Sequence, residues 1–554
     1  MNDLRNVYAA KAISQIPRIL SLQDRNLFSP TYGCMHRDYW LYKTSDFADA
    51  VRQFGVHALA LVYARDFPNN PYRNHPKIRD WAFAAMEFWI SIQHKDGSFD
   101  EFYPFERGWV GPTAFTTFTM VESLNLLKDE IPSDLEKRLR ITISQAAHFI
   151  AAGESEEDHL ANHHAMACLA VWKAYRLLND PGLKEGFARV WRNFLKYHNA
   201  KEGWSREYDG VDPGYLSATV SFLGKIYADN PDPEILEVLK QSVEFCSYFV
   251  YPNGFFAGSM GSRNTLHFYA HGFEILSDKI PMAGSIAEKM VKALSEGKLV
   301  PPEIMSDRYL FYRVPEFLQA YLDYGARPTV PPPLPYEREE TSYFPESRIY
   351  FSSKGDHSVI ANLAKGGVVK VFERKNGRLL LNDCGVVGKL EDGTIVTTQW
   401  VDPAYQAKGD ENSWEVSGSF NAVPSNKLFT PLKNLVFRGV LVGLGWSSKF
   451  SHRLKGGIRK SLMLGRRPVS LQFKRLFQWQ NGSMELTTEI WSEGGARVKY
   501  LSVGDEFFVR YVPQSRFFQM QELETRAYHL SSDEIANINR GQRVTIRSLI
   551  GGNS

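Results

Sequence analysis

The feature that most restricts the fold of this chain is a change of sequence pattern at residues 327–337. Before this segment, apolar residues recur at three- and four-residue spacing, which is typical of packed helices. After it, apolar and polar residues alternate between turn pairs, which is typical of strands. The segment itself contains five prolines, and proline cannot continue a helix because it lacks an amide N–H. The pattern predicts a helical domain over residues 1–326, a proline-rich linker over 327–337 and a β-sandwich domain over 338–554.

In the helical part, a short glycine-containing loop recurs between the predicted helices. These glycines stand at positions 97, 153, 203 and 254, so the intervals are 56, 50 and 51 residues. A period of about fifty residues suits a unit of two helices and two connections. An open solenoid would be expected to use a shorter and more regular unit, so we expect the hairpins to close into an α/α toroid. An irregular helical bundle is the alternative.

In the second part, strong hairpin signals separate short apolar or alternating runs. The turn pairs include Asn376-Gly377, Asp392-Gly393 and Asn481-Gly482. Many short strands with no intervening helix predict a large antiparallel sandwich. The predicted fold class is therefore an α/α toroid of helical hairpins followed by an antiparallel β-sandwich.

Composition narrows the class of protein. A hydrophobic content of 44% and a charged content of 23% are ordinary for a soluble globular protein. The four cysteines are far apart and show no CxxC spacing, so neither a zinc site nor a disulfide framework is predicted, and no cofactor is expected. The first residues lack an apolar signal-peptide core, and no apolar run approaches the roughly eighteen residues of a membrane span. We therefore expect a cytoplasmic protein.

The residues most suited to chemistry lie one repeat apart. Asn162 and His163 open a predicted helix, and Tyr215 follows 52 residues after His163 (215 − 163 = 52). If the repeats are neighbouring hairpins, both motifs lie at the same end of the ring and face one cleft. An amide, an imidazole and a phenol could then act together on one ligand. A packing or capping role for the two histidines of this helix is the alternative.

The Asn-His pair that opens a helix, followed by the Asp-Gly…Gly-Tyr motif at 209–215, resembles the active site of the heparinase II/III and alginate lyase superfamily. The resemblance implies a toroid followed by a β-sandwich, and cleavage of uronate-containing glycans by β-elimination. It assigns to Asn162, helped by His163, the stabilisation of the enolate-like anion that forms when the C5 proton leaves. It assigns the proton transfers to Tyr215. Nearby cations, Arg206 among them, are expected to lower the pKa of that tyrosine.

Further residues are predicted to bind substrate. Arg263 can hold a carboxylate through two parallel hydrogen bonds, and His267 can line the same cleft. Trp109 lies in an equivalent loop region and can shape a subsite, and Arg206 completes this predicted set. A structural cap is the alternative for the loop that carries Arg263. His164 leaves the helix on a different side from His163 and is expected to be structural.

The resemblance fails in the first strands of the sandwich. The superfamily usually carries a histidine-containing stretch there, which contributes a catalytic histidine or a metal ligand. The corresponding residues 364–372 and 378–385 contain no histidine, so no metal site is predicted. Three interpretations stay open at this point. The chain is a lyase that relies on tyrosine, a uronosyl C5-epimerase that returns the proton, or a non-catalytic protein that binds glycans.

Residues 431–480 contain eleven Lys and Arg residues and no Asp or Glu. The stretch predicts a track for an acidic glycan, a segment that docks on anionic lipid, or strands with a solvated basic face. No nucleic-acid-binding motif accompanies the charge, so nucleic acid is not a predicted partner. The predicted function is that of an intracellular polysaccharide lyase, peripheral to the inner membrane and linked to surface polysaccharide metabolism.

Overall fold

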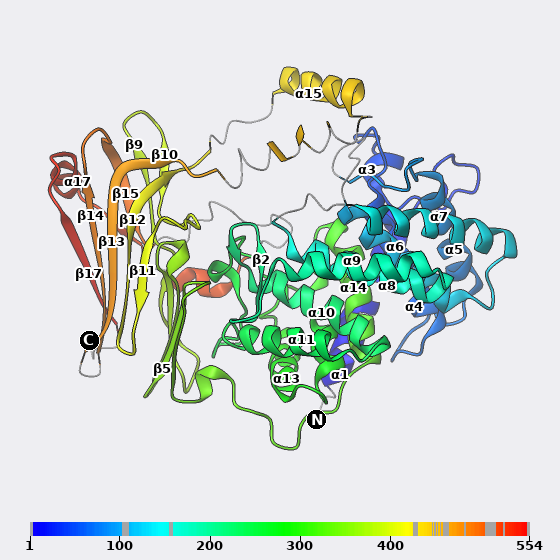
Figure 1. Ribbon diagram of the computed structural model, residues 1–554, viewed down its shortest axis with the longest axis horizontal. Coiled ribbons are helices and arrows are strands. Elements are labelled where there is room, and N and C mark those ends of the chain that lie inside the picture. Colours follow the sequence, from blue (N-terminus) through cyan, green and yellow to red (C-terminus); the bar gives the residue numbers. More distant parts are fainter. Residues whose placement is uncertain are drawn as a thin grey trace.

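The computed structural model places helices at one end of the molecule and two sheets at the other (Figure 1). We call residues 4–326 the helical half and residues 338–550 the sandwich. Trp109, one of the predicted substrate-binding residues, lies outside the described residues. The structure describes residues 4–550 except 102–109, 154–158, 425–429, 446, 448–449, 451–452, 455, 458–464, 481–482, 505–516 and 525–526.

Among the described residues, a ring of inner helices forms the centre of the helical half. Each inner helix packs against the next, and the last packs against the first, so the ring is closed. These helices are buried on nearly all sides, which is the pattern of a helix that packs against neighbours all round. They are α4 (Gly55–Ala64), α6 (Val110–Leu127), α8 (Ala161–Leu178), α10 (Pro213–Asp229), α12 (Ala270–Leu276) and α14 (Asp307–Leu322).

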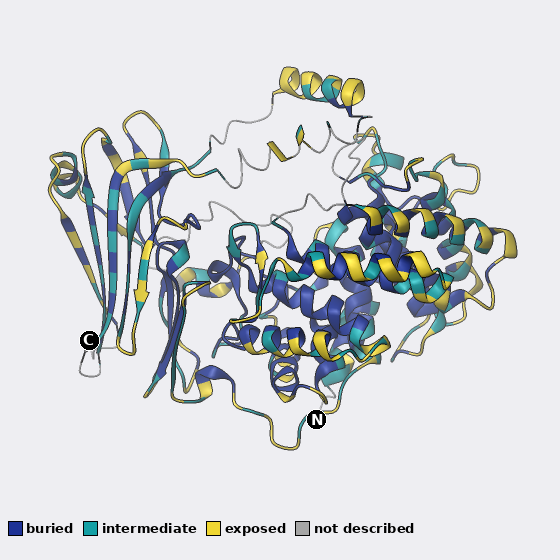
Figure 2. Cartoon of the chain, viewed as in Figure 1, coloured by how far each residue is buried: buried dark blue, intermediate teal, exposed yellow. Residues whose placement is uncertain are grey.

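An outer helix packs against each inner helix. The outer helices are amphipathic, with apolar residues toward the ring and charged residues toward solvent (Figure 2). They are α1 (Leu4–Ile13), α5 (Pro76–Ser91), α7 (Ser133–Ala152), α9 (Pro181–Leu195), α11 (Pro233–Ser247) and α13 (Pro281–Ser295). Short elements complete this half: α2 (Ile16–Leu22), α3 (Arg37–Trp40), η1 (Ala50–Phe54), η2 (Gly258–Met260), η3 (Pro302–Ile304) and the small sheet of β1 (His198–Asn199), β2 (Trp204–Glu207) and β3 (Gly210–Val211).

The recurring glycines lie where an outer helix returns to the ring. Gly97 and Gly203 both have a φ near +90° (90° and 85°), a conformation that L side chains rarely adopt. A Cβ at either position would also lie 2.5 Å or less from a carbonyl oxygen of the next outer helix, that of Gln145 or Gln241. Gly153 differs, because it ends α7 with a φ of −62°. The fifty-residue period therefore marks the hairpin unit of the closed ring.

The sandwich consists of two antiparallel sheets. The five-stranded sheet has the order β4-β5-β6-β7-β8, and the nine-stranded sheet has the order β16-β15-β9-β10-β12-β13-β14-β17, with β11 paired to β12. The strands are β4 (Glu340–Phe344), β5 (Ile349–Lys354), β6 (His357–Asn362), β7 (Val368–Glu373), β8 (Leu379–Asp383), β9 (Val386–Leu390), β10 (Ile395–Thr397), β11 (Gln406–Gly409), β12 (Ser413–Ala422), β13 (Pro468–Gln480), β14 (Ser483–Ser492), β15 (Val498–Val503), β16 (Tyr528–His529) and β17 (Val544–Ile550).

The central strands β5, β6 and β7 of the five-stranded sheet are buried on both faces. Tyr350 and Val359 belong to the apolar core between the two sheets, whereas Phe351 and Ile360 belong to the core of the helical half. Neighbouring residues of a strand point to opposite faces, so one sheet serves both cores. Apolar residues on one face of this sheet thus pack against the helical half, and those on the other face pack against the second sheet.

The fold class predicted from the sequence is confirmed, with one correction. The sandwich region was expected to contain no helix, but α15 (Pro431–Leu444) and α17 (Ser532–Asn539) lie within it. The basic stretch is therefore partly helix and partly the strand β13. Between the end of α14 and the start of β4 the chain contains only the short turn η4 (Pro335–Glu337). The domain boundaries placed at 326 and 338 stay a prediction.

Candidate functional site

A cavity of about 70 Å³ lies at the end of the ring where the inner helices begin. Asn162 and His163 reach it from the first turn of α8, and Tyr215 reaches it from the first turn of α10. Tyr215 follows His163 by 52 residues in the sequence, and the structure brings both residues, together with Asn162, to one wall of the cavity. Because helix N-termini carry partial positive charge, this end of the ring favours an anionic ligand. The other lining residues are Val51, Glu101, Phe115, Tyr269, Arg308, Tyr309 and Tyr312.

Asn162 is held by Glu207, a buried residue of β2. The backbone N–H of Asn162 donates to Glu207 Oε1 at 2.6 Å, and the side-chain Nδ2 donates to the same oxygen at 2.8 Å. One hydrogen of the amide is thereby engaged and the orientation of the group is fixed. Burial raises the pKa of Glu207 to about 8, although the hydrogen bonds from Asn162 oppose the rise. Near neutral pH the carboxyl group is therefore largely protonated.

Tyr215 is held through the N-cap of its helix. Asp212 caps α10 and accepts a hydrogen bond from the Tyr215 backbone N–H at 3.2 Å. Burial raises the pKa of Tyr215 well above its usual value, and Tyr309 and Tyr208 raise it further. Arg263 acts in the opposite direction and lowers the pKa of Tyr215. The phenol of Tyr215 is therefore neutral over the physiological pH range.

His163 and His164 have different surroundings, although they are neighbours in α8. The imidazole of His163 is partly exposed and meets the ring of Phe115 edge-on, with 5.5 Å between the ring centres. The imidazole of His164 is buried and stacks on Tyr197 at 4.5 Å. His163 thus lines the cavity, and His164 packs in the protein interior, as was expected for it.

The predicted substrate-binding residues lie in different places. Arg263 is buried and its guanidinium lies 4.2 Å from the centre of the Tyr208 ring. His267 is buried and stacks on Tyr309 at 4.7 Å, so it supports the cavity wall from behind. Arg206 is exposed and its Nε donates to the carbonyl oxygen of Tyr208 at 3.3 Å. None of these three lines the cavity.

The expectation that Arg206 lowers the pKa of Tyr215 is wrong. The strand β2 turns Arg206 outward and its neighbour Glu207 inward, because adjacent strand residues face opposite sides. The cation that does act on Tyr215 is Arg263, and its effect is smaller than that of burial. The pKa of Tyr215 is raised rather than lowered.

Seven of the lining residues were not recognised in the sequence, and four of these lie at the starts of α12 and α14. Arg308, Tyr309 and Tyr312 come from the first turns of α14, and Tyr269 is the N-cap of α12. The guanidinium of Arg308 forms an ion pair with Glu101. A signal was available, because Tyr269 follows Tyr215 by 54 residues (269 − 215 = 54), one further repeat. Within the described residues, no cluster of three or more His, Cys, Asp or Glu side chains suits a metal ion.

Comparisons with known proteins agree with this architecture. The family model of the ulvan lyase N-terminal domain matches residues 71–294, a range that begins shortly before α5 and reaches into the last turn of α13. A solved xanthan lyase from Paenibacillus aligns with 90% of this chain at a TM-score of 0.51 and 10% identity. The alignment spans only 46% of the xanthan lyase chain, so this chain has the length of about half that enzyme.

A second solved structure is the chondroitin AC lyase of Streptomyces coelicolor A3 in complex with chondroitin sulphate. It aligns with 90% of this chain and 68% of its own, with a TM-score of 0.52 and 10% identity. No curated protein matches the chain by sequence. The resemblance to the polysaccharide lyase superfamily, inferred above from short motifs, is confirmed at the level of the fold.

Proposed function

We propose that this chain, a divergent relative of the polysaccharide lyases, cleaves an acidic glycan at a uronate residue by β-elimination. The observation that carries the proposal is the meeting of Asn162, His163 and Tyr215 at one cavity. Five inner helices, α6, α8, α10, α12 and α14, place residues of their first two turns or N-caps on its wall. Their N-termini favour the carboxylate of a uronate over a neutral sugar.

The reaction removes the proton from C5, breaks the bond between C4 and its glycosidic oxygen, and forms a C4–C5 double bond. Negative charge develops on the uronate carboxylate as the proton leaves. The amide of Asn162, held by Glu207, is a donor whose direction is fixed before the reaction, which is the arrangement that stabilises developing charge. His163 is the second donor at the same wall.

Tyr215 supplies the proton that the leaving oxygen needs. Its raised pKa keeps the phenol protonated in the free protein, which suits a general acid. Where the C5 proton and the leaving oxygen lie on the same face of the sugar, Tyr215 gives its phenol proton to the leaving oxygen and is protonated again by the C5 proton. Where they lie on opposite faces, His163 takes it. The two stereochemical classes of uronate therefore depend on His163 to different extents.

The test follows two signals on a panel of uronate glycans in heavy water. Absorbance of the unsaturated uronate reports elimination, and deuterium at C5 reports proton removal alone. A lyase gives rising absorbance in the wild type and none in Tyr215→Phe. The matched control is Tyr500→Phe, which removes a hydroxyl from an exposed position of β15. Deuterium uptake without absorbance would point to a C5-epimerase, and silence on both signals across the panel would contradict the proposal.

A second proposal concerns the helix α15, which we propose docks on an anionic membrane surface. Its large apolar residues are exposed to an unusual degree: Leu432, Leu435, Val436 and Val442 are 60–71% exposed, and only Leu441 is buried (Figure 2). The 50-residue basic stretch begins with this helix and contains no acidic residue. Apolar residues and cations on one segment fit the interface of an anionic bilayer. Among the described residues, no helix is long and apolar enough to cross a membrane.

Vesicle co-sedimentation tests this second proposal. The wild type should bind vesicles that contain phosphatidylglycerol, should bind pure phosphatidylcholine weakly, and should dissociate as salt is added. Leu435→Glu with Val442→Glu should lower binding by about tenfold or more, because two buried apolar contacts with lipid are lost. The control Leu549→Glu changes an equally exposed leucine of β17. Equal binding by the wild type and the double variant would contradict the proposal. The cytoplasmic location and the link to surface polysaccharides stay predictions, which cell fractionation would test.

A further inference from the structure

One lysine of the sandwich reaches into the helical half. Lys365, at the end of η5 (Leu363–Lys365), is only 3% exposed. Its ammonium group donates to the carbonyl oxygens of Ser259 and Gly261, both at 2.8 Å, and to Oδ1 of Asn264 at 2.6 Å. An ammonium group has three hydrogens, and each of these three acceptors lies in residues 259–264. We call residues 257–265 the clamped loop.

The clamped loop is hydrogen-bonded to the residues that hold the catalytic candidates. The hydroxyl of Ser262 donates to the backbone carbonyl of Glu207 at 2.8 Å. The backbone N–H of Arg263 donates to Oδ2 of Asp212 at 2.9 Å. Glu207 orients Asn162, and Asp212 caps the helix that begins before Tyr215. A displacement of the loop would therefore reach Asn162 and Tyr215 through one hydrogen-bonded residue each.

The backbone of the clamped loop is strained. Ala257 and Asn264 both have a φ of 52°, a left-handed conformation that is costly for alanine in particular. Such a conformation persists where surrounding contacts enforce it. Lys365 supplies three of those contacts, and Asn362 adds a fourth by donating from Nδ2 to the carbonyl oxygen of Met260 at 2.7 Å.

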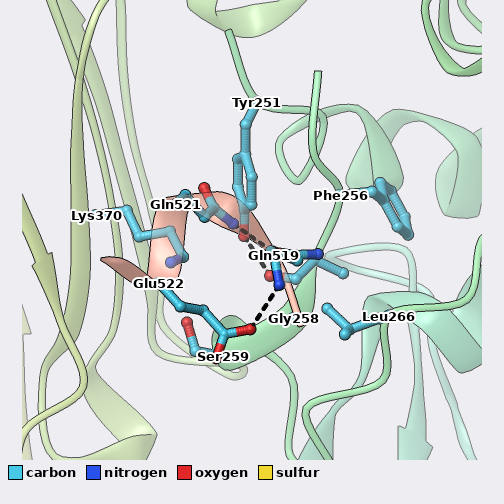
Figure 3. A pocket seen from close by; sticks show the side chains of 10 residues that line it. Tyr251, Phe256, Gly258, Ser259, Leu266, Lys370, Gln519, Gln521 and Glu522 are labelled. Atoms are coloured by element: carbon cyan, nitrogen blue, oxygen red, sulfur yellow. Dashed lines mark hydrogen bonds between the residues drawn. The ribbon is translucent and has the colours of Figure 1, made fainter. Parts of the chain in front are cut away.

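A second part of the sandwich borders the same loop (Figure 3). Gly258 and Ser259 share a small cavity with Lys370 of β7 and with Gln519 and Gln521 around η8 (Met520–Glu524). Lys370 directs its ammonium group to Oδ1 of Asn382 in β8. Lys365 and Lys370 are thus equally buried, but the hydrogen bond from Lys370 to Asn382 stays within the sandwich.

We infer that Lys365 is a positioning residue, through which the sandwich fixes the clamped loop and, by way of Glu207 and Asp212, the side chains of Asn162 and Tyr215. The inference rests on the proposed function for its catalytic consequence. It also gives the sandwich a part in the site, although residues 364–372 and 378–385 contain no histidine. The sandwich acts here through the helical half, by way of the hydrogen bonds of Lys365 to the clamped loop.

The test combines turnover with hydrogen exchange in the full-length protein. Lys365→Met should lower kcat by about 10- to 100-fold, the cost of small misplacements at a reacting centre, with a smaller change in KM. The same variant should speed amide exchange at Arg263 and Tyr215, whose N–H groups both bind Asp212. Lys365→Arg should restore part of both properties. The matched control Lys370→Met removes an equally buried lysine and should leave kcat and these two amides unchanged.

Asn264→Gly provides a milder variant should Lys365→Met fail to fold. Glycine accepts the φ of 52°, and the change removes one of the three acceptors of Lys365. It should shift kcat and the exchange of the Arg263 amide in the same direction by a smaller amount. Wild-type kcat and exchange in both variants, or effects equal to those of Lys370→Met, would overturn the inference. A wild type that is inactive on every glycan would overturn the proposed function instead, because the exchange comparison needs no substrate.

Discussion

The two halves of the molecule contribute to the cavity in different ways. Among the described residues, those that line it all come from the helical half, between Val51 in η1 and Tyr312 in α14. The sandwich contributes Lys365, which binds the loop behind the cavity. Side chains from the starts of the inner helices meet at this cavity, whereas the buried side chains of the five-stranded sheet pack into two apolar cores. We therefore expect substitutions at the starts of the inner helices to change turnover. Substitutions in the sheets should change the stability of the protein or the positions of the cavity residues.

The largest effect after that of Tyr215→Phe is expected from Asn162→Ala. The substitution removes the amide donor and leaves Glu207 Oε1 without the Nδ2 hydrogen bond. Loss of one preorganised donor typically lowers kcat by about 10²- to 10³-fold. Steady-state kinetics on the best glycan of the panel would measure it. The matched control is Asn412→Ala at an exposed turn of the sandwich, and equal activity of the two variants would remove Asn162 from the mechanism.

A smaller effect is expected from Tyr309→Phe. The hydroxyl of Tyr309 raises the pKa of Tyr215, so its removal should lower that pKa. A general acid loses activity above its pKa, and the alkaline limb of the kcat/KM profile should therefore move to lower pH. Loss of the Tyr309 hydroxyl from the cavity wall should reduce kcat by up to about tenfold. Tyr312→Phe removes a hydroxyl from the same wall and is the control. An unmoved alkaline limb would show that Tyr215 is not the titrating acid.

A change in the pH dependence of stability is expected from Glu207→Gln. The pKa of Glu207 is raised from 4.5 to about 8 in the folded protein, so the folded state binds the additional proton. The stabilisation is complete below about pH 4.5 and is lost as the pH rises through about 8. The free energy of unfolding of the wild type, relative to that of the glutamine variant, should fall across this window by several kcal/mol, at about 1.4 kcal/mol per pKa unit.

Chemical denaturation at several pH values would measure this difference. Turnover should change little, because the amide oxygen of glutamine replaces Oε1 as the acceptor for Asn162. Glu411→Gln, at an exposed position of the sandwich, is the control and should leave the pH dependence unchanged. A constant difference between wild type and Glu207→Gln from pH 4 to 9 would contradict the raised pKa.

The sequence was sufficient for the fold because its signals are local. Spacings of three to four residues and of two residues distinguish helices from strands without knowledge of tertiary contacts. Asn162, His163 and Tyr215 could be found because they occupy equivalent places in successive repeats. Closure of the ring brings α14 back against α4, and that contact has no local signal. Tyr309, which lies 94 residues after Tyr215 (309 − 215 = 94), was therefore not predicted as a site residue.

The error at Arg206 has a similar cause. The cation of Arg206 and the carboxyl group of Glu207 are adjacent in β2. Which of the two side chains is buried depends on which face of this four-residue strand points to the interior. Arg206 was expected to act on Tyr215 because a nearby cation lowers the pKa of a tyrosine. The structure buries Glu207 instead, since Asn162 offers two hydrogen bonds to it. A strand this short gives too few alternating positions to assign its faces from sequence.

The smallest effect on turnover is expected from Phe473→Ala in β13. Its ring is fully buried between the sheets and meets Tyr405 edge-on at 5.0 Å. Truncation should cost about 3–5 kcal/mol of stability, because a cavity remains in a packed core. Well below the unfolding temperature, kcat should equal that of the wild type.

The matched substitution in the helical half is Phe115→Ala, which removes the ring that contacts His163. It should lower kcat while costing less stability, because Phe115 is partly exposed. Kinetics and denaturation of the pair would separate the two halves directly. If Phe473→Ala lowered kcat as much as Phe115→Ala does, the core of the sandwich would be coupled to the cavity more strongly than the contacts of Lys365 account for. The division between a reacting half and a supporting half would then have to be abandoned.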